Sequence, residues 1–168
     1  MADTQLILDH VFDHEASQPE RVFLSQPLDG GVVDDITWGR TVGEARRMAA
    51  HLRSRGFPAG ARIALLTKNY THFLMAELAI WMAGGTTVAV FPTETADNLH
   101  YVLEHSEASL LFVGKLDQWA QHAAGVPAGL PCIALPLAPP TSFERARVAG
   151  ASACYWPPPR RASWISRC

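Results

Sequence analysis

The sequence predicts an α/β fold, in which a partial parallel sheet of about four strands is flanked by helices. Three short and nearly unbroken apolar runs occur in its central part, at residues 63–66, 88–91 and 110–113. Runs without alternation are typical of strands buried on both faces, which is the condition of parallel strands covered by helices. Two segments with helical spacing separate the runs, so their order predicts two consecutive crossover units.

The N-terminal part predicts a helix followed by a β-hairpin. Apolar residues recur at helical spacing over residues 5–16, and Pro19 limits this helix. Two β-prone runs, at 21–26 and 32–38, then flank the Asp-Gly-Gly sequence at 29–31. A glycine-rich loop between two such runs is typical of a hairpin.

Two helices are predicted on either side of the first buried strand. Residues 41–55 repeat apolar positions at helical spacing, and Gly56 provides a C-terminal stop. Residues 71–83 are apolar on most sides, which predicts a helix packed against more than one neighbour. We interpret its single acid, Glu77, as an edge group that reaches solvent rather than as a catalytic carboxylate.

The apolar segment 73–91 could be mistaken for a membrane span. It contains Glu77, two consecutive glycines and two consecutive threonines, which are unfavourable in a bilayer helix. The same residues suit a helix, a turn and a strand in succession. No integral membrane segment is therefore predicted.

The later elements are shorter. Thr95 can cap a helix whose first turn contains Asp97, a favourable charge at a helix N-terminus. A short polar helix is predicted over residues 115–124, and a fourth parallel strand over residues 131–135.

Composition excludes several classes of function. The chain has 168 residues, of which 48% are hydrophobic, so it can bury a core, and its net charge of −2 provides no basic surface for nucleic acid. The three cysteines show no metal-ligand spacing, and an odd number argues against a disulfide framework. Since the first residues lack the features of a secretory signal, a reducing, cytoplasmic location is expected. His10 and His14 lie four apart without a third ligand, so we interpret them as surface residues and predict no metal site.

The pattern changes after residue 136. We expect residues 1–136 to form one subdomain and residues 137–168 to form an irregular, disordered tail. Residues 141–168 hold five arginines and one acid, Glu144, whereas residues 1–140 carry a net charge of −6. Two explanations remain open: a natural tail, or a change of reading frame after Pro140.

The sequence contains none of the common phosphate-loop, GxSxG or HExxH motifs. In an open parallel sheet, ligands bind outside the carboxyl ends of the strands. The only two lysines, Lys68 and Lys115, both follow predicted strands at this edge. One hypothesis is an anion site formed by these lysines, and the other is a chance placement of two surface charges.

From Trp38 onward, the order of features resembles the N-terminal part of the AMP-forming acyl-CoA synthetases, an adenylate-forming superfamily that includes fatty-acid–CoA ligases and luciferases. The matching pieces occur in family order at 36–38 (ITW), 57–64 (FPAGARIA), Asn69, 81–85 (WMAGG), 90–92 (VFP), 103–108 (LEHSEA) and 111–113 (LFV). Each piece alone is short, but their order and spacing are specific, and the resemblance covers about residues 5–136.

The resemblance implies a ligase that activates a small-molecule carboxylate with ATP and Mg²⁺, forms an acyl-adenylate and transfers the acyl group to CoA. The family's phosphate loop, its acidic nucleotide contacts and its C-terminal lysine would follow the matching stretch, and this sequence lacks them. We therefore assign no catalytic, cofactor-binding or metal-binding residue. We expect a truncated part of such an enzyme that is inactive alone and can self-associate; the alternative is a small non-catalytic module that binds a nucleotide or a partner.

Overall fold

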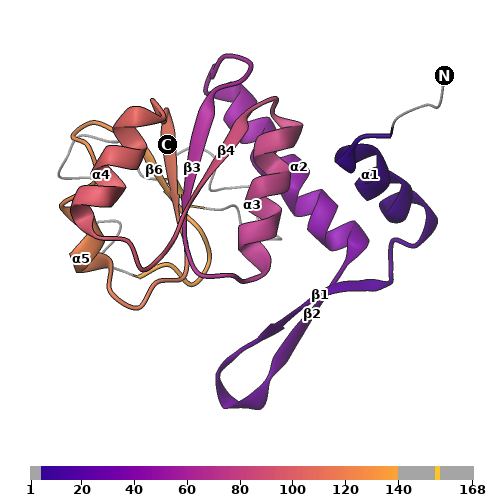
Figure 1. The fold of residues 1–168 in the computed structure, drawn as a ribbon. Coiled ribbons are helices and arrows are strands. Elements are labelled where there is room, and N and C mark those ends of the chain that lie inside the picture. Colours follow the sequence, from indigo (N-terminus) through magenta and orange to yellow (C-terminus); the bar gives the residue numbers. More distant parts are fainter. Residues whose placement is uncertain (1–4, 140–153, 156–168) are drawn as a thin grey trace.

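The computed structural model describes residues 5–139 and a short strand at 154–155 (Figure 1). The elements in chain order are α1 (Ile7–Ser17), β1 (Val22–Pro27), η1 (Asp29–Gly31), β2 (Val33–Thr37), α2 (Trp38–Ser54), β3 (Arg62–Leu66), α3 (Thr71–Met82), β4 (Thr86–Val90), α4 (Ala96–His105), β5 (Leu110–Val113), α5 (Trp119–Ala123), β6 (Cys132–Ala134) and β7 (Cys154–Tyr155).

The main sheet is parallel throughout and has the order β4-β3-β5-β6-β7. In its centre, Leu65 of β3 is in register with Ala89 of β4 on one side and with Phe112 of β5 on the other. The predicted α/β class and the four predicted parallel strands, β3 to β6, are confirmed.

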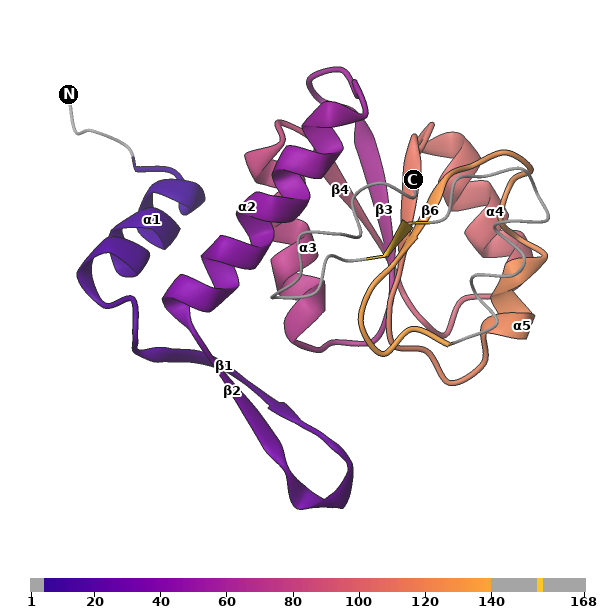
Figure 2. The ribbon, with the colours of Figure 1, turned by 180° about the vertical axis from the view of Figure 1, so that it is seen from behind.

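Helices cover both faces of the sheet (Figures 1 and 2). Ile63 and Leu65 of β3 belong to one buried cluster, which includes residues of α1, α2 and α3. Ala64 and Leu66, which alternate with them, belong to a second cluster with residues of α4 and α5. Successive residues of a strand point to opposite faces. The unbroken apolar run in β3 is therefore needed because each face has its own layer of helices.

The hairpin β1–β2 is a separate antiparallel sheet. It projects from the helices on the same side as the carboxyl ends of the parallel strands (Figures 1 and 2). Gly30 and Gly31 in its turn have φ angles of 73° and 78°, a region that L side chains rarely adopt. The predicted glycine-rich hairpin is thus present, and the glycines have a conformational reason to be there.

Two boundaries differ from the predictions. Helix α2 begins at Trp38 rather than at residue 41, because the Thr37 hydroxyl accepts a hydrogen bond from the Arg40 N–H (3.2 Å) and caps the helix. The helix predicted over residues 115–124 is only Trp119–Ala123. It is not a polar surface helix, since Trp119 and His122 are 5% and 3% exposed.

The segment 73–91 forms most of α3, a turn and strand β4. Gly84 in the turn has a φ of 79°, as expected for a residue that ends a helix. Across the described part of the chain, no helix is both long and apolar enough to cross a membrane.

Most of the predicted tail, namely residues 140–153 and 156–168, lies outside the described residues. The exception is β7, which pairs in parallel with β6 through Cys154 and Tyr155. No strand was predicted there, because two residues are too few for an apolar run to be recognised.

Candidate functional site

The carboxyl edge of the parallel sheet is the candidate site, and its loops are joined to one another. The Lys68 N–H, just after β3, donates to the Lys115 carbonyl just after β5 (2.9 Å). The Thr67 hydroxyl lies 3.1 Å from the Lys68 carbonyl and 3.4 Å from the Lys115 carbonyl. These contacts join the loop after β3 to the loop after β5.

Gly114 lies at the centre of this edge. A Cβ added there would overlap the Thr67 hydroxyl and come within 2.8 Å of the Tyr70 hydroxyl. The loops after β3 and β5 can approach this closely only because residue 114 has no side chain.

Tyr70 joins a third loop to the same edge. Its hydroxyl donates to the Pro136 carbonyl (2.9 Å), which follows β6. Burial raises the pKa of Tyr70, so the phenol stays protonated and keeps this hydrogen bond throughout the neutral range. Tyr70 therefore acts as a structural tie rather than as an acid or a base.

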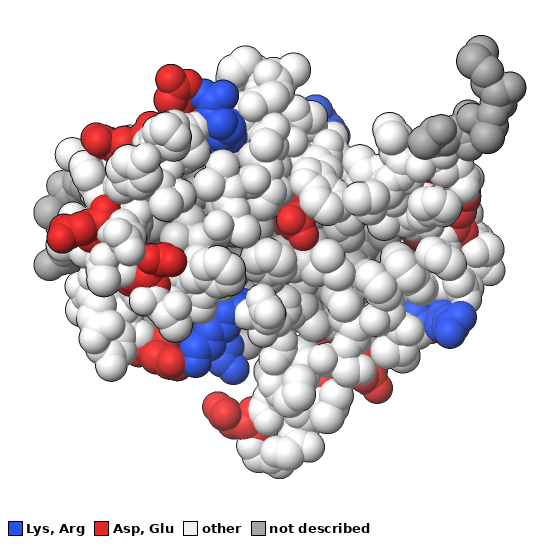
Figure 3. All heavy atoms as spheres, in the orientation of Figure 1, with Lys and Arg blue, Asp and Glu red and all other residues white. Residues whose placement is uncertain are grey.

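The structure brings Lys68 and Lys115 to the same edge, as the sequence predicted. The Lys68 ammonium forms an ion pair with Asp117 (2.5 Å), whose side chain is 73% exposed. Figure 3 shows basic and acidic side chains next to each other at the lower edge of the molecule. Asp117 therefore offsets one of the two lysine charges at this edge, and the anion site stays a prediction.

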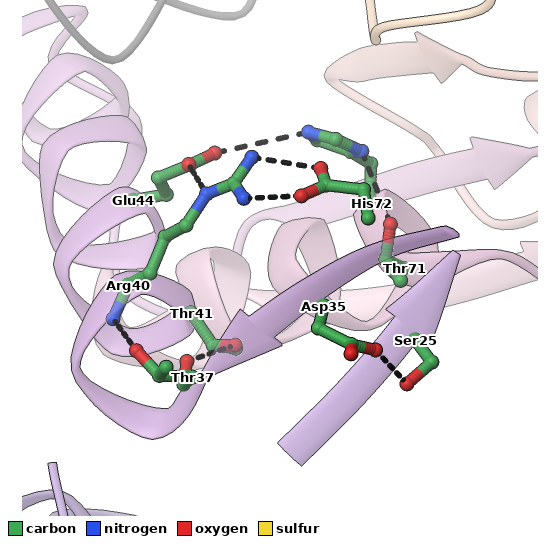
Figure 4. A network of polar contacts seen from close by, with 9 residues as sticks. Ser25, Asp35, Thr37, Arg40, Thr41, Glu44, Thr71 and His72 are labelled. Carbon is green, nitrogen blue, oxygen red and sulfur yellow. Dashed lines mark hydrogen bonds and ion pairs between the residues drawn. The ribbon is translucent and has the colours of Figure 1, made fainter. Parts of the chain in front are cut away.

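A partly buried polar network joins the hairpin to the helices (Figure 4). Arg40 of α2 binds both carboxylate oxygens of Asp34 in β2, at 2.7 and 3.0 Å. It also donates to Glu44 (3.2 Å), whose side chain is only 2% exposed. His72 at the start of α3 lies 3.7 Å from Glu44. The network therefore connects the hairpin, α2 and α3.

No sequence pattern predicted this network. Arg40, Glu44 and Asp34 come from two elements, and His72 comes from a third. The four-residue spacing of Arg40 and Glu44 is a common helical pair and carries no sign of burial. The one sign of a buried polar group in the sequence was Glu44, an acid between the apolar residues Val42 and Ala45 of α2.

Glu77 was interpreted as an edge group that reaches solvent. In the structure it is half-buried on α3. Burial raises the pKa of its carboxyl group.

His10 and His14 are exposed, and His14 stacks on Trp38 with ring centroids 4.8 Å apart. Within residues 5–139, no three His, Cys, Asp or Glu side chains are grouped so that they could hold a metal ion.

Among the described residues, Cys132 has a free thiol. It is buried in β6, and burial raises its pKa to about 12. A buried thiol of this kind is a poor nucleophile, since the thiolate is the reactive form. We therefore exclude Cys132 as a catalytic residue.

Comparison with known proteins gives consistent results. The family model of AMP-binding enzymes matches residues 11–154. Long-chain-fatty-acid–CoA ligase FadD15 of Mycobacterium bovis and of Mycobacterium tuberculosis are each 30% identical over 145 residues, which covers 84% of this chain and 24% of theirs. The chain thus spans about a quarter of the length of these curated relatives. A linear gramicidin synthase of Brevibacillus parabrevis is also 30% identical, over 111 residues, covering 66% of this chain and 2% of its own.

Solved structures show the same fold. The fatty acyl-adenylate ligase from L. pneumophila, crystallised with acyl adenylate and pyrophosphate, aligns with a TM-score of 0.62 and 18% identity. The alignment covers 79% of this chain and 23% of that ligase. The structure of IdnL1 aligns with a TM-score of 0.66 and 20% identity, covering 78% of this chain and 26% of its own.

Proposed function

The chain belongs to the family of AMP-binding enzymes, and we propose that it is the N-terminal part of an acyl-CoA synthetase that cannot form acyl-adenylates alone. The observation that carries this proposal is the extent of the match. The family match spans most of the chain, while the chain spans only 24% of the two fatty-acid–CoA ligases. The names of these relatives support a fatty acid as the carboxylate and CoA as the acceptor in the intact enzyme.

We propose that the described carboxyl edge by itself binds neither ATP nor Mg²⁺. Adenylation needs donors that hold the phosphates and cations that offset the charge developing between the carboxylate and the α-phosphorus. Here the Lys68 N–H donates to a neighbouring loop, and its ammonium is paired with Asp117. Within residues 5–139, no three His, Cys, Asp or Glu side chains are grouped so that they could hold a metal ion. We therefore derive no catalytic step at this edge.

The test is carboxylate-dependent exchange of labelled pyrophosphate into ATP by the purified chain, with short to long fatty acids. We expect no exchange, because removing even one well-placed donor costs on the order of a hundredfold in rate and here a whole set is missing. FadD15 of Mycobacterium tuberculosis is the positive control. Exchange that scales with this chain and is lost in Lys68→Ala or Lys115→Ala would contradict the proposal.

A second candidate is a non-catalytic module that binds a nucleotide or another protein. The exposed apolar side chain of Phe91, 73% exposed at the end of β4, favours the protein-binding form. Equilibrium dialysis with ATP, AMP and CoA distinguishes the nucleotide-binding form from the synthetase fragment. Micromolar binding by the chain alone would favour a nucleotide-binding module.

We place the end of the subdomain after Tyr155, beyond the boundary predicted at residue 136. The family match to residue 154 and the pairing of β7 with β6 both support this position. A change of reading frame would then fall after residue 155. Reading the encoding DNA in its other two frames tests this, because a frame change predicts a Ser/Thr/Gly-rich loop followed by Lys-Gly downstream.

We keep a cytoplasmic location as a proposal, supported by the cysteine pattern.

A further inference from the structure

One side of the molecule presents an apolar surface that its own helices do not cover. Phe73, Glu77 and Trp81 recur every fourth residue along α3 and are all half-buried. Ala89 of strand β4 and Phe91, which directly follows the strand, continue this surface, and both are exposed. We call these five residues the α3–β4 face.

The strand residues of the α3–β4 face lie on the same side of the sheet as α3. Ala89 is in register with Leu65, and Leu65 belongs to the buried cluster that contains the α3 side chains. In an extended chain, Phe91 continues the side of Ala89, two residues further on. Leu65 is fully buried while its neighbour Ala89 is exposed, so the helices that cover β3 leave the carboxyl end of β4 partly open.

The edge of β4 is also open for pairing. Among the described strands, β4 pairs only with β3. Its sequence, Thr86–Val90, contains β-branched residues and neither a charge nor a proline. Edge strands exposed to water are usually protected by such charges, prolines or bulges, and a strand without them readily accepts another strand. The composition of β4 is that of an interior strand.

The charge pattern agrees with a covered surface. Figure 3 shows one acidic group over α3 surrounded by uncharged surface, and Glu77 is the only acid of that helix. The carboxyl group is already partly removed from water in this chain. A covering layer should therefore be apolar and should bring one hydrogen-bond donor opposite Glu77.

We propose that the α3–β4 face is the docking surface for the part of the adenylate-forming protein that follows this segment in its relatives. The inference rests on the proposed function, since it requires that the chain be one part of a longer enzyme. About three quarters of each FadD15 lies outside the match, so a large polypeptide is available to cover the face. The covering segment would add a strand to β4 and would place apolar side chains against Phe73 and Trp81 of the α3–β4 face.

Fragment complementation tests the docking surface. The full 168-residue chain is mixed with a fragment of FadD15 from Mycobacterium tuberculosis that lacks the matched first quarter. The matched quarter of FadD15 itself, mixed with the same fragment, is the positive control. Light scattering after gel filtration reports the mass of the complex, and hydrogen exchange reports protection of the β4 amides.

We expect a one-to-one complex, protection of the β4 amides and loss of any self-association of the chain. Ala89→Lys should weaken the complex by about tenfold or more, because it places a charge in an apolar contact. Tyr101→Lys is the matched control, since Tyr101 is 64% exposed on α4 at the opposite face of the sheet, and it should leave the affinity unchanged.

Three results would overturn the docking surface. The first is the absence of a complex when the control quarter of FadD15 assembles. The second is a complex that Ala89→Lys and Tyr101→Lys affect equally. The third is an oligomer of this chain that persists in excess fragment, which would make a second copy the occupant. A complex that assembles but shows no pyrophosphate exchange, while the control complex does, would leave the surface standing and contradict the proposed function.

Discussion

Helices α3 and α4 both connect parallel strands of the main sheet, yet their outer sides differ. Helix α3 joins the neighbours β3 and β4, and α4 leads from β4 across β3 to β5. The outer side of α4 carries charged and polar groups, and its buried residues are Leu99 and Leu103 on one side only. Helix α3 is buried against both α2 and the sheet, and its remaining side is still mainly apolar. Two crossover helices of one sheet thus have different surroundings: α4 is a surface helix, and α3 has the composition of a helix between two layers.

The largest expected effect compares one leucine from each helix. Leu78 of α3 and Leu103 of α4 are both 2% exposed, so the same atoms are removed from equal burial. We expect Leu78→Ala to lower the free energy of unfolding by about 4 kcal/mol and Leu103→Ala by about 3 kcal/mol. The difference arises because α4 can move towards the cavity, whereas α3 is held by α2 and the sheet.

Urea unfolding, fitted with one m-value for all proteins, measures the free energy of unfolding of both variants. Tyr101→Ala on the exposed side of α4 is the control and should change stability by less than about 0.5 kcal/mol. A larger loss from Leu103→Ala than from Leu78→Ala would reverse the comparison.

The second prediction concerns the charges that tie α3 to α2 and the hairpin. Arg40→Met removes a partner from the buried carboxylate of Glu44, so we expect a loss of about 2 kcal/mol. This is below the usual cost of breaking a buried pair because the Arg40 side chain is 37% exposed. Thermal unfolding measures the loss, and the double variant Arg40→Met with Glu44→Gln should recover part of it. If the double variant is less stable than Arg40→Met, the charge explanation is wrong.

The third prediction concerns strand β4. The Thr87 hydroxyl is buried and has no hydrogen-bond partner in the described part of the chain. Thr87→Val should therefore raise the free energy of unfolding by about 1 kcal/mol. Thr86→Val, at an exposed position of the same strand, is the matched control and should stay within about 0.5 kcal/mol. Equal gains from both variants would point to strand propensity instead.

The smallest effect is the pH dependence contributed by Glu77. Burial raises the pKa of its carboxyl group in the folded chain above the ordinary value of 4.5. The protonated carboxyl therefore contributes stability at pH values below 4.5, and this contribution is lost as pH rises through the folded-state pKa. Glu77→Gln does not titrate, so the stability of wild type relative to the variant should fall as pH rises above 4.5. Parallel curves from acid to neutral pH would show that the carboxyl is not desolvated.

The strands of the sheet could be predicted because burial on both faces leaves a pattern in the chain itself, as in the run at 63–66. The Thr95 cap of α4 could also be predicted, because threonine before a helical run is itself a local signal of a helix start. Its hydroxyl does accept the Asn98 N–H. The start of α2 was missed because Thr37 ends a β-prone run and caps a helix at the same time.

The polar network around Arg40 and Glu44 could not be predicted by such reasoning. Pattern shows which residues are apolar, but it does not show which polar side chains meet across elements. Asp34 approaches Arg40 because the hairpin folds back beside α2, and His72 approaches Glu44 because α3 packs against α2. The short helix α5 was misjudged for a related reason, since its polar His122 is buried and its Nδ1 lies 3.0 Å from the Gln118 carbonyl.

The order of strands in the sheet has a consequence for the timing of folding during synthesis. Strand β3 pairs with β4 on one side and with β5 on the other, so it acquires its second neighbour only when residues 110–113 have left the ribosome. The hairpin, whose two strands are joined by a tight turn, needs no such wait. Contacts that are distant in sequence form slowly because a long loop must close first. The apolar β3 and α3 are therefore exposed on the nascent chain for longer than the hairpin, and they are the segments that a chaperone would meet.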